Sequence, residues 1–121
     1  MARVILTTFG LLALLAASAP AADDPKGIDF FEKNIRPVLV EHCYKCHSAN
    51  AKKLQGGLSL DTRDGIRKGG DTGPAVVPGK PAESLLLTAV RYTDESLQMP
   101  PKGKLPAAAI ADLEAWVNEG A

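Results

Sequence analysis

Apolar residues recur at the spacing of an amphipathic helix in three segments of this chain. The first segment covers about residues 29–42, with Asp29 as the expected N-cap and Pro37 inside it. The second covers about residues 81–92 and the third about residues 106–120, and both open on a proline, which suits the first turn of a helix. No segment longer than a few residues alternates as a strand would. The pattern therefore predicts an all-α fold of three main helices, with a kink or a restarted turn at Pro37.

Between the first two helices lies a long irregular region, residues 48–81, which holds most of the glycines of the chain. Within it, Asp61 is placed to cap a short helix from about Thr62 to Lys68, which Gly69 would end. A loop region of this length in a small domain usually has a functional reason. Wrapping one face of a bound group would be such a reason.

The amino-acid composition bounds the size of the core. The 121 residues make one small domain and contain three Phe, two Tyr and one Trp. A core this poor in large side chains would be only marginally stable by itself. A buried prosthetic group would supply the missing apolar mass.

The first residues have the pattern of a secretory signal peptide. Arg3 supplies the positive charge, an apolar run follows, and Ala19-Pro20-Ala21 fits a cleavage site of small residues. We expect residues 1–21 to be the signal, residues 22–27 a flexible polar leader and residues 28–121 the functional domain of a protein exported to the periplasm. The apolar run is short for a membrane span, although an uncleaved anchor is the alternative. No later segment of the sequence could span a membrane.

The charge balance excludes one class of function. Without the signal, the chain has 13 basic and 14 acidic side chains, because Arg3 is the one charged residue removed from 14 of each sign. A net charge of −1 gives no support for nucleic-acid binding. Residues 42–60 and 96–111 contain no Asp or Glu. These two acid-free windows hold five lysines: Lys45, Lys52, Lys53, Lys102 and Lys104.

The most specific feature of the sequence is Cys43-Tyr44-Lys45-Cys46-His47. Two cysteines three residues apart, with a histidine directly after the second, form the attachment sequence of a c-type haem. Each thiol can form a thioether bond with one vinyl group, and the histidine is then held beside the iron as its proximal ligand. The alternatives are a zinc site, which needs four ligands, and a dithiol redox motif, which needs a βαβ context. The sequence offers neither, so we predict one covalent haem c.

Met99 is the candidate for the second axial ligand of the iron. Without the signal it is the only methionine, and Pro100 and Pro101 directly after it restrict its backbone. A thioether sulfur is a neutral, soft ligand that favours reduced iron. The alternative is that Met99 fills a gap in the core. His42, the only other histidine, is tethered beside Cys43, so we expect it at the surface or near the site and not on the iron.

From about Ile28 to its C-terminus, the chain resembles the planctomycete-type cytochrome c domain, a branch of the class I c-type cytochromes. The stretches that carry the resemblance, besides Cys43-x-x-Cys46-His47, are Ile35-Arg36-Pro37-Val38-Leu39, Gly57-Leu58-Ser59-Leu60-Asp61, Lys68-Gly69-Gly70, Pro78-Gly79-Lys80-Pro81 with Ser84-Leu85-Leu86, Met99-Pro100-Pro101, and Leu113-x-x-Trp116-Val117-x-x-Gly120-Ala121. Domains of this family are often fused to larger downstream regions, whereas this sequence stops after its last helix. We therefore expect a free-standing carrier or a subunit.

The resemblance implies a small class I cytochrome c fold, in which three main helices, a short helix and long loops surround one haem. It implies that His47 is the proximal ligand and Met99 the distal ligand. It implies that the first and last helices cross, and the candidate contacts are Phe31 and Ile35 against Leu113 and Trp116. It also implies that a proline carbonyl orients the proximal histidine, with Pro74 the first candidate and Pro78 the second.

A six-coordinate iron has no open position, and the sequence offers no catalytic constellation elsewhere. The leading hypothesis is therefore an electron carrier, not an enzyme, that exchanges electrons with a redox partner protein through the haem edge. The five lysines of the acid-free windows would form a basic rim for an acidic partner, although an ordinary solvated surface is the alternative. Two other hypotheses stay open. One is a haem peroxidase or gas sensor in which Met99 leaves the iron, and the other is an interaction domain that haem merely staples together.

Overall fold

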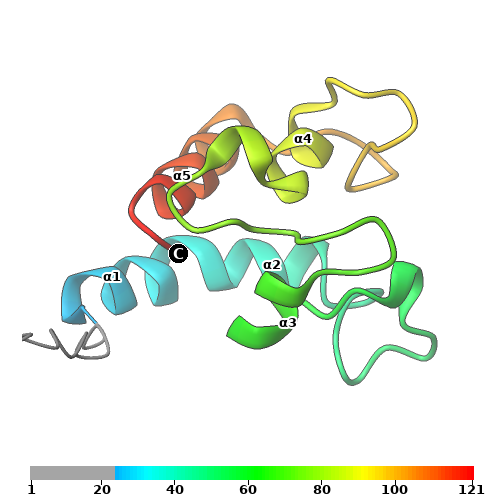
Figure 1. The fold of residues 1–121 in the computed structure, drawn as a ribbon, viewed down its shortest axis with the longest axis horizontal. Helices are drawn as coiled ribbons and strands as arrows, with labels where there is room; N and C mark the ends of the chain where they lie inside the picture. The colour runs from blue at the N-terminus through cyan, green and yellow to red at the C-terminus, as the bar shows by residue number, and fades with distance from the viewer. Residues whose placement is uncertain (1–23) are drawn as a thin grey trace, which may run out of the picture.

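The computed structural model describes residues 24–121. In this part of the chain, helices are joined by long loops (Figure 1). The helical elements are α1 (Pro25–Phe30), η1 (Phe31–Ile35), α2 (Arg36–His42), η2 (Gln55–Gly57), α3 (Arg63–Lys68), η3 (Pro81–Glu83), α4 (Leu85–Arg91) and α5 (Ala107–Asn118). These residues contain no β-strand, only an isolated bridge between Gly70 and Gly73. The all-α prediction is thereby confirmed. The predicted signal peptide, residues 1–21, lies outside the described residues.

The first long helix runs without a break from α1 to α2, but its middle element, η1, is a π-helical turn. Pro37 explains this turn, because a proline has no N–H to donate to the carbonyl four residues earlier and its ring crowds that carbonyl. The wider turn in front of it has the amide of Arg36 bonded to the carbonyl of Phe31, five residues back. The restart predicted at Pro37 therefore takes the form of a π-helical turn that keeps the helix continuous.

The start of this helix differs from the prediction. Asp24, not Asp29, is the N-cap, and its carboxylate accepts hydrogen bonds from the amides of Lys26 and Gly27, both at 3.2 Å. Pro25 follows as the first helical residue, where its missing N–H costs nothing. Residues 25–27, expected in the polar leader, are therefore helical. Asp29 instead pairs with Lys33 on the exposed face at 2.9 Å.

The core forms where η1 meets α5, as expected for the first and last helices. The rings of Phe31 and Trp116 lie 5.5 Å apart at 41°, and Ile35 and Leu113 are almost completely buried. The contact between Phe31 and Trp116, which the family resemblance implied, is confirmed, and Ile35 and Leu113 belong to the same buried cluster. The buried cluster consists of Ile35, Leu39, Leu60, Ile66, Ala75, Val76, Leu86, Leu87, Val90, Leu105, Ile110, Leu113, Trp116 and Val117. It holds α4, α5 and the first helix together.

Two further helix starts differ in detail from the prediction. The N-cap of α3 is Thr62, whose hydroxyl accepts from the amide of Gly65 at 3.0 Å, and not Asp61. Gly69 ends α3 with a φ of 74°, as expected for a glycine at that position. The helix predicted over residues 81–92 is divided into η3 and α4, because Ser84 adopts an extended conformation between them.

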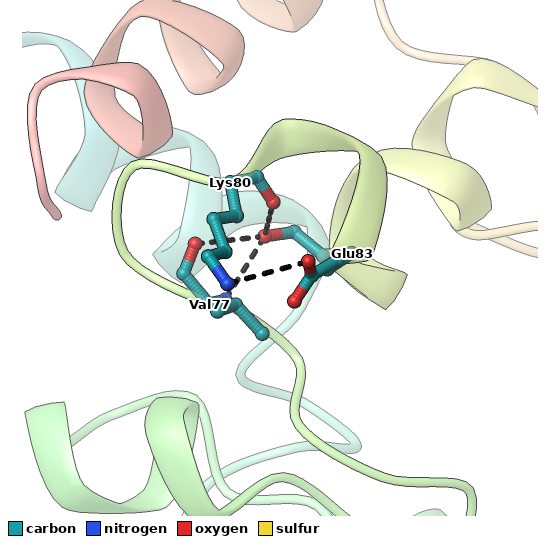
Figure 2. Close-up of polar contacts among 4 residues, drawn as sticks. Val77, Lys80 and Glu83 are labelled. Atoms are coloured by element: carbon teal, nitrogen blue, oxygen red, sulfur yellow. Dashed lines mark hydrogen bonds and ion pairs between the residues drawn. The ribbon is translucent and has the colours of Figure 1, made fainter.

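Ser84 is buried and ties the turn before η3 to the start of α4. Its hydroxyl accepts from the amide of Val77 at 2.9 Å and donates to the carbonyl of Lys80 at 2.9 Å. Figure 2 shows the backbone of Val77 and Lys80 around this hydroxyl, and beside it the ion pair between the side chains of Lys80 and Glu83. The two charged groups lie 3.4 Å apart. The amide of Gly79 in turn bonds the carbonyl of Val117 at 2.8 Å, which joins the turn to α5.

We expect Ser84→Ala to lower the free energy of unfolding by about 1–3 kcal/mol, because it leaves the amide of Val77 without its partner in a buried place. Urea unfolding followed by circular dichroism measures this loss. Ser96→Ala is the matched control, since that hydroxyl is exposed and bonds Asp94 two residues away, and it should change stability by less than about 0.5 kcal/mol. Equal effects of the two substitutions would contradict a structural role for Ser84.

Candidate functional site

Cys43 to His47 form one tight turn directly after α2. The carbonyl of Cys43 accepts from the amide of Cys46 at 3.1 Å and from the amide of His47 at 2.9 Å. Residues three and four apart are neighbours along such a turn, so Cys46 and His47 both follow Cys43 by one turn of the backbone. Both cysteines are free thiols.

The imidazole of His47 is oriented by a backbone carbonyl. Its Nδ1 lies 3.1 Å from the carbonyl oxygen of Gln55. A carbonyl oxygen only accepts, so Nδ1 carries the proton of this bond and Nε2 keeps a lone pair that can bind a metal. The proposed orientation by Pro74 or Pro78 is therefore wrong. Gln55 takes that place because its own amide bonds the carbonyl of Cys46 at 3.1 Å, which folds the loop back immediately onto the cysteine turn.

Glycines behind this loop hold Gln55 in place. The carbonyl of Gly56 accepts from the amide of Asp71 at 2.9 Å, and a Cβ added to Gly70 would lie 2.2 Å from that same carbonyl oxygen. Only a glycine allows the two backbones to approach this closely. The turn that contains Gly70 therefore supports the loop that orients His47. This is the role of part of the glycine-rich region, which the sequence pattern alone did not reveal.

The residues directly after His47 are held from a third segment. The carbonyl of His47 accepts from the amide of Leu60 at 2.8 Å, and the carboxylate of Asp61 accepts from the amide of Ala49 at 2.9 Å. The hydroxyl of Ser59 donates to the same carboxylate. These hydrogen bonds, that of Ser59 first, lower the pKa of Asp61 below its usual range, because they stabilise the charged form.

The two thiols differ in their surroundings. Cys43 is half-buried, and burial raises its pKa to about 11, whereas Cys46 is exposed. A neutral thiol does not suit the low-pKa dithiol motif that was the alternative. Among residues 24–121, no group of three or more His, Cys, Asp or Glu side chains is placed to hold a metal ion. His42 lies at the surface, as expected, with Nε2 3.6 Å from the carboxylate of Glu41.

Met99 lies on the loop between α4 and α5. Figure 1 shows this loop, in yellow to orange, and the loop that follows α2 at the same end of the molecule. The amide of Met99 bonds the carbonyl of Ala89 at 3.1 Å, and the peptide bond from Met99 to Pro100 is cis. The Met99 side chain is 38% exposed. This exposure contradicts the alternative in which Met99 fills a gap in the core.

A separate groove of about 640 Å³ lies between the first helix, α3 and the C-terminal residues. Its walls include Phe31, Arg36, Tyr44, Ile66 and Trp116. None of the four predicted haem-binding residues lines it. The groove nevertheless adjoins the cysteine turn, because Tyr44, Leu60 and Asp61 line it as well.

The residues present fit a covalent haem c. The described part of the chain exposes four large apolar side chains, Ile28, Val40, Leu54 and Met99. Val40 precedes Cys43 by almost one helical turn, and Leu54 adjoins Gln55, so these two flank the cysteine turn. A haem is a large apolar surface that such side chains can cover. Cys43 and Cys46 would hold it, and His47 has a free Nε2 for the iron.

We expect Asp61 to stabilise the fold at neutral pH and to lose this effect in acid. Because its pKa is lowered in the folded state, its contribution is complete above the unfolded value of about 3.9 and disappears as the pH falls through the folded value. The urea midpoint of Asp61→Asn should therefore lie below that of the wild type at about pH 7 and approach it at about pH 2.5. Glu95→Gln, at an exposed loop carboxylate, is the control. A difference in urea midpoint between the wild type and Asp61→Asn that stays constant with pH would contradict this dependence on the Asp61 charge.

Comparison with known proteins gives one finding. A family model described as planctomycete cytochrome C matches residues 43–103. No curated protein and no solved structure matches the chain. No helix among residues 24–121 is long and apolar enough to cross a membrane. The family match covers just over half of the chain and includes both the turn from Cys43 to His47 and the loop of Met99, so the chain belongs to the planctomycete cytochrome c family.

Proposed function

We propose that this protein is a periplasmic electron carrier with one haem c, attached to Cys43 and Cys46 and ligated by His47 and Met99. The observation that carries the proposal is the bond from His47 Nδ1 to the carbonyl of Gln55, which leaves Nε2 available and fixes the plane of the ring. When bound, the haem supplies an iron that changes its charge by one electron. The protein supplies the attachment, the orientation and the surroundings.

The ligand pair decides between electron transfer and chemistry at the iron. Two protein ligands would close the coordination sphere, so that a substrate or a gas would first have to displace one of them. The peroxidase and gas-sensor hypothesis therefore needs Met99 to leave, and it is tested below by the same measurement.

The lysine distribution supports a partner with an acidic surface. All five lysines of the acid-free windows are exposed, and none of them takes part in an ion pair within residues 24–121. By contrast, Lys33 and Lys80 pair with Asp29 and Glu83. In the part of the chain that the structure describes, Lys26 and Lys68 are also exposed and unpaired, but only the five lysines of the acid-free windows lie on the two loops that carry the proposed haem ligands. We call this set the basic rim: Lys45, Lys52, Lys53, Lys102 and Lys104.

The periplasmic location rests on the sequence of residues 1–21 and on the two thiols. Exported proteins with two cysteines normally form a disulfide. Attachment of a haem would consume both thiols and prevent this pairing. We propose that the signal is cleaved and that the released domain works without a membrane span.

The central test is the intact mass and spectrum of the protein made together with a c-type maturation system. We expect the mass to include one haem, a pyridine haemochrome spectrum of the c type, and a charge-transfer band from methionine sulfur to ferric iron. Met99→Ala should keep the covalent haem and lose this band. A mass without haem would overturn the proposal as a whole. Rapid carbon monoxide binding by the reduced wild type would instead support the gas-sensor alternative.

The basic rim makes electron transfer depend on salt. With an acidic copper redox protein as acceptor, we expect the association rate of the wild type to fall as ionic strength rises. The double variant Lys102→Glu with Lys104→Glu should react several-fold more slowly at low salt, on the order of tenfold, and like the wild type at high salt. Stopped-flow mixing measures both.

The matched control, Lys26→Glu with Lys68→Glu, reverses the charge of two lysines outside the rim. It changes the net charge by the same amount as the rim variant. This control should slow the reaction much less than the rim variant does. Equal slowing by both double variants would show that net charge, and not the place of the lysines, governs the encounter. Rates that do not respond to salt would show that charge has no effect on it.

A further inference from the structure

Tyr92 has an unusual backbone conformation directly before the loop of Met99. It ends α4 with φ 60° and ψ 31°, in the left-handed region, which a residue with a Cβ seldom adopts. Glycine or asparagine is the usual residue at such a helix end. A tyrosine held there points to a compensating interaction of its side chain.

The side chain of Tyr92 supplies that interaction. Its hydroxyl donates to the carbonyl of Pro100, the residue directly after Met99. The carbonyl of Pro100 also lies 3.4 Å from the amide of Gly103. The left-handed turn is therefore what directs the tyrosine ring across the loop toward Pro100.

A second bond holds the other side of Met99. The carbonyl of Ala89, near the end of α4, accepts from the amide of Met99 at 3.1 Å and from that of Tyr92 at 3.3 Å. Pro100 and Pro101 have no N–H, so Met99 carries the one backbone donor of the three residues. That donor is used. The backbone of Met99 is thus tied to α4 through its own amide and through the carbonyl that follows.

The anchor of these bonds is rigid. Four of the seven residues of α4, Leu86, Leu87, Ala89 and Val90, are buried in the core. The side chain of Met99 remains partly exposed, so it can turn while its backbone stays fixed. A ligand whose backbone is already held in this way loses little further backbone freedom when it binds.

We propose that Tyr92 is a positioning residue that sets how firmly Met99 holds the sixth position of the iron. The inference rests on the proposed function, because it takes Met99 as the ligand. Tyr92→Phe keeps the ring and removes only the bond to Pro100. Free imidazole should then displace Met99 more easily from the ferric protein.

The test is imidazole titration of the ferric haem protein, followed by loss of the methionine charge-transfer band. We expect Tyr92→Phe to bind imidazole about fivefold more tightly than the wild type, the effect of losing one ordinary hydrogen bond. Ser96→Ala is the control, because the hydroxyl of Ser96 lies in the same loop and bonds only Asp94. This substitution should change the affinity for imidazole by less than about twofold. Equal affinities for wild type and Tyr92→Phe, or equal shifts for both variants, would overturn the role of Tyr92.

Two further readings separate this inference from the function on which it rests. If the wild type lacks the charge-transfer band, or Met99→Ala retains it, Met99 is not the ligand and the proposed function itself fails. Hydrogen exchange in the reduced wild type needs no variant. The amide of Met99 should exchange far more slowly than that of Lys102 in the same loop. Equal exchange of the two amides would show that the loop is not anchored to α4.

Discussion

The hydrogen bond between the imidazole of His47 and the carbonyl of Gln55 is the contact around which the site is built. It selects one tautomer, fixes the ring plane and leaves Nε2 to act as a ligand. The bond depends on the position of a loop backbone, and that backbone depends on the close approach of Gly56 and Gly70. A histidine placed only by its neighbours in sequence would rotate, whereas here a second and a third segment determine its orientation.

The proposed distal side follows the same physical plan with different parts. There, too, a loop carries the residue of interest and a backbone carbonyl holds it, in this case the carbonyl of Ala89 near the end of the buried helix α4. Proline, not glycine, limits the freedom of this loop, because Pro100 and Pro101 restrict φ and remove two donors. Both loops therefore gain their definition from main-chain bonds to rigid neighbours. Neither relies on a hydrophobic core of its own.

Much of the helical architecture could be predicted from the sequence, because apolar spacing is a local signal. The last helix, α5, and the end of α3 at Gly69 are examples. The crossing of Phe31 with Trp116 is not local, and it was expected from the family resemblance. The helix starts were harder, since Asp24 and Asp29 are both able to cap and only the capping geometry distinguishes them. The acceptor for His47 could not be predicted at all. It is a main-chain carbonyl, which every residue has, and its place depends on how a glycine-rich loop folds back.

The π-helical turn at η1 has a consequence for the direction in which the cysteines face. Such a turn holds one more residue than a regular turn, and each residue rotates an α-helix by about 100°. Phe31 packs against α5 before this turn, and Cys43 leaves α2 after it. The angle between these two directions around the helix axis therefore differs from the angle in a regular helix. A single residue of helical register thus sets the direction of the attachment turn relative to the core. Gain or loss of one residue between these two points would redirect both thiols while leaving every side chain of the cysteine motif unchanged.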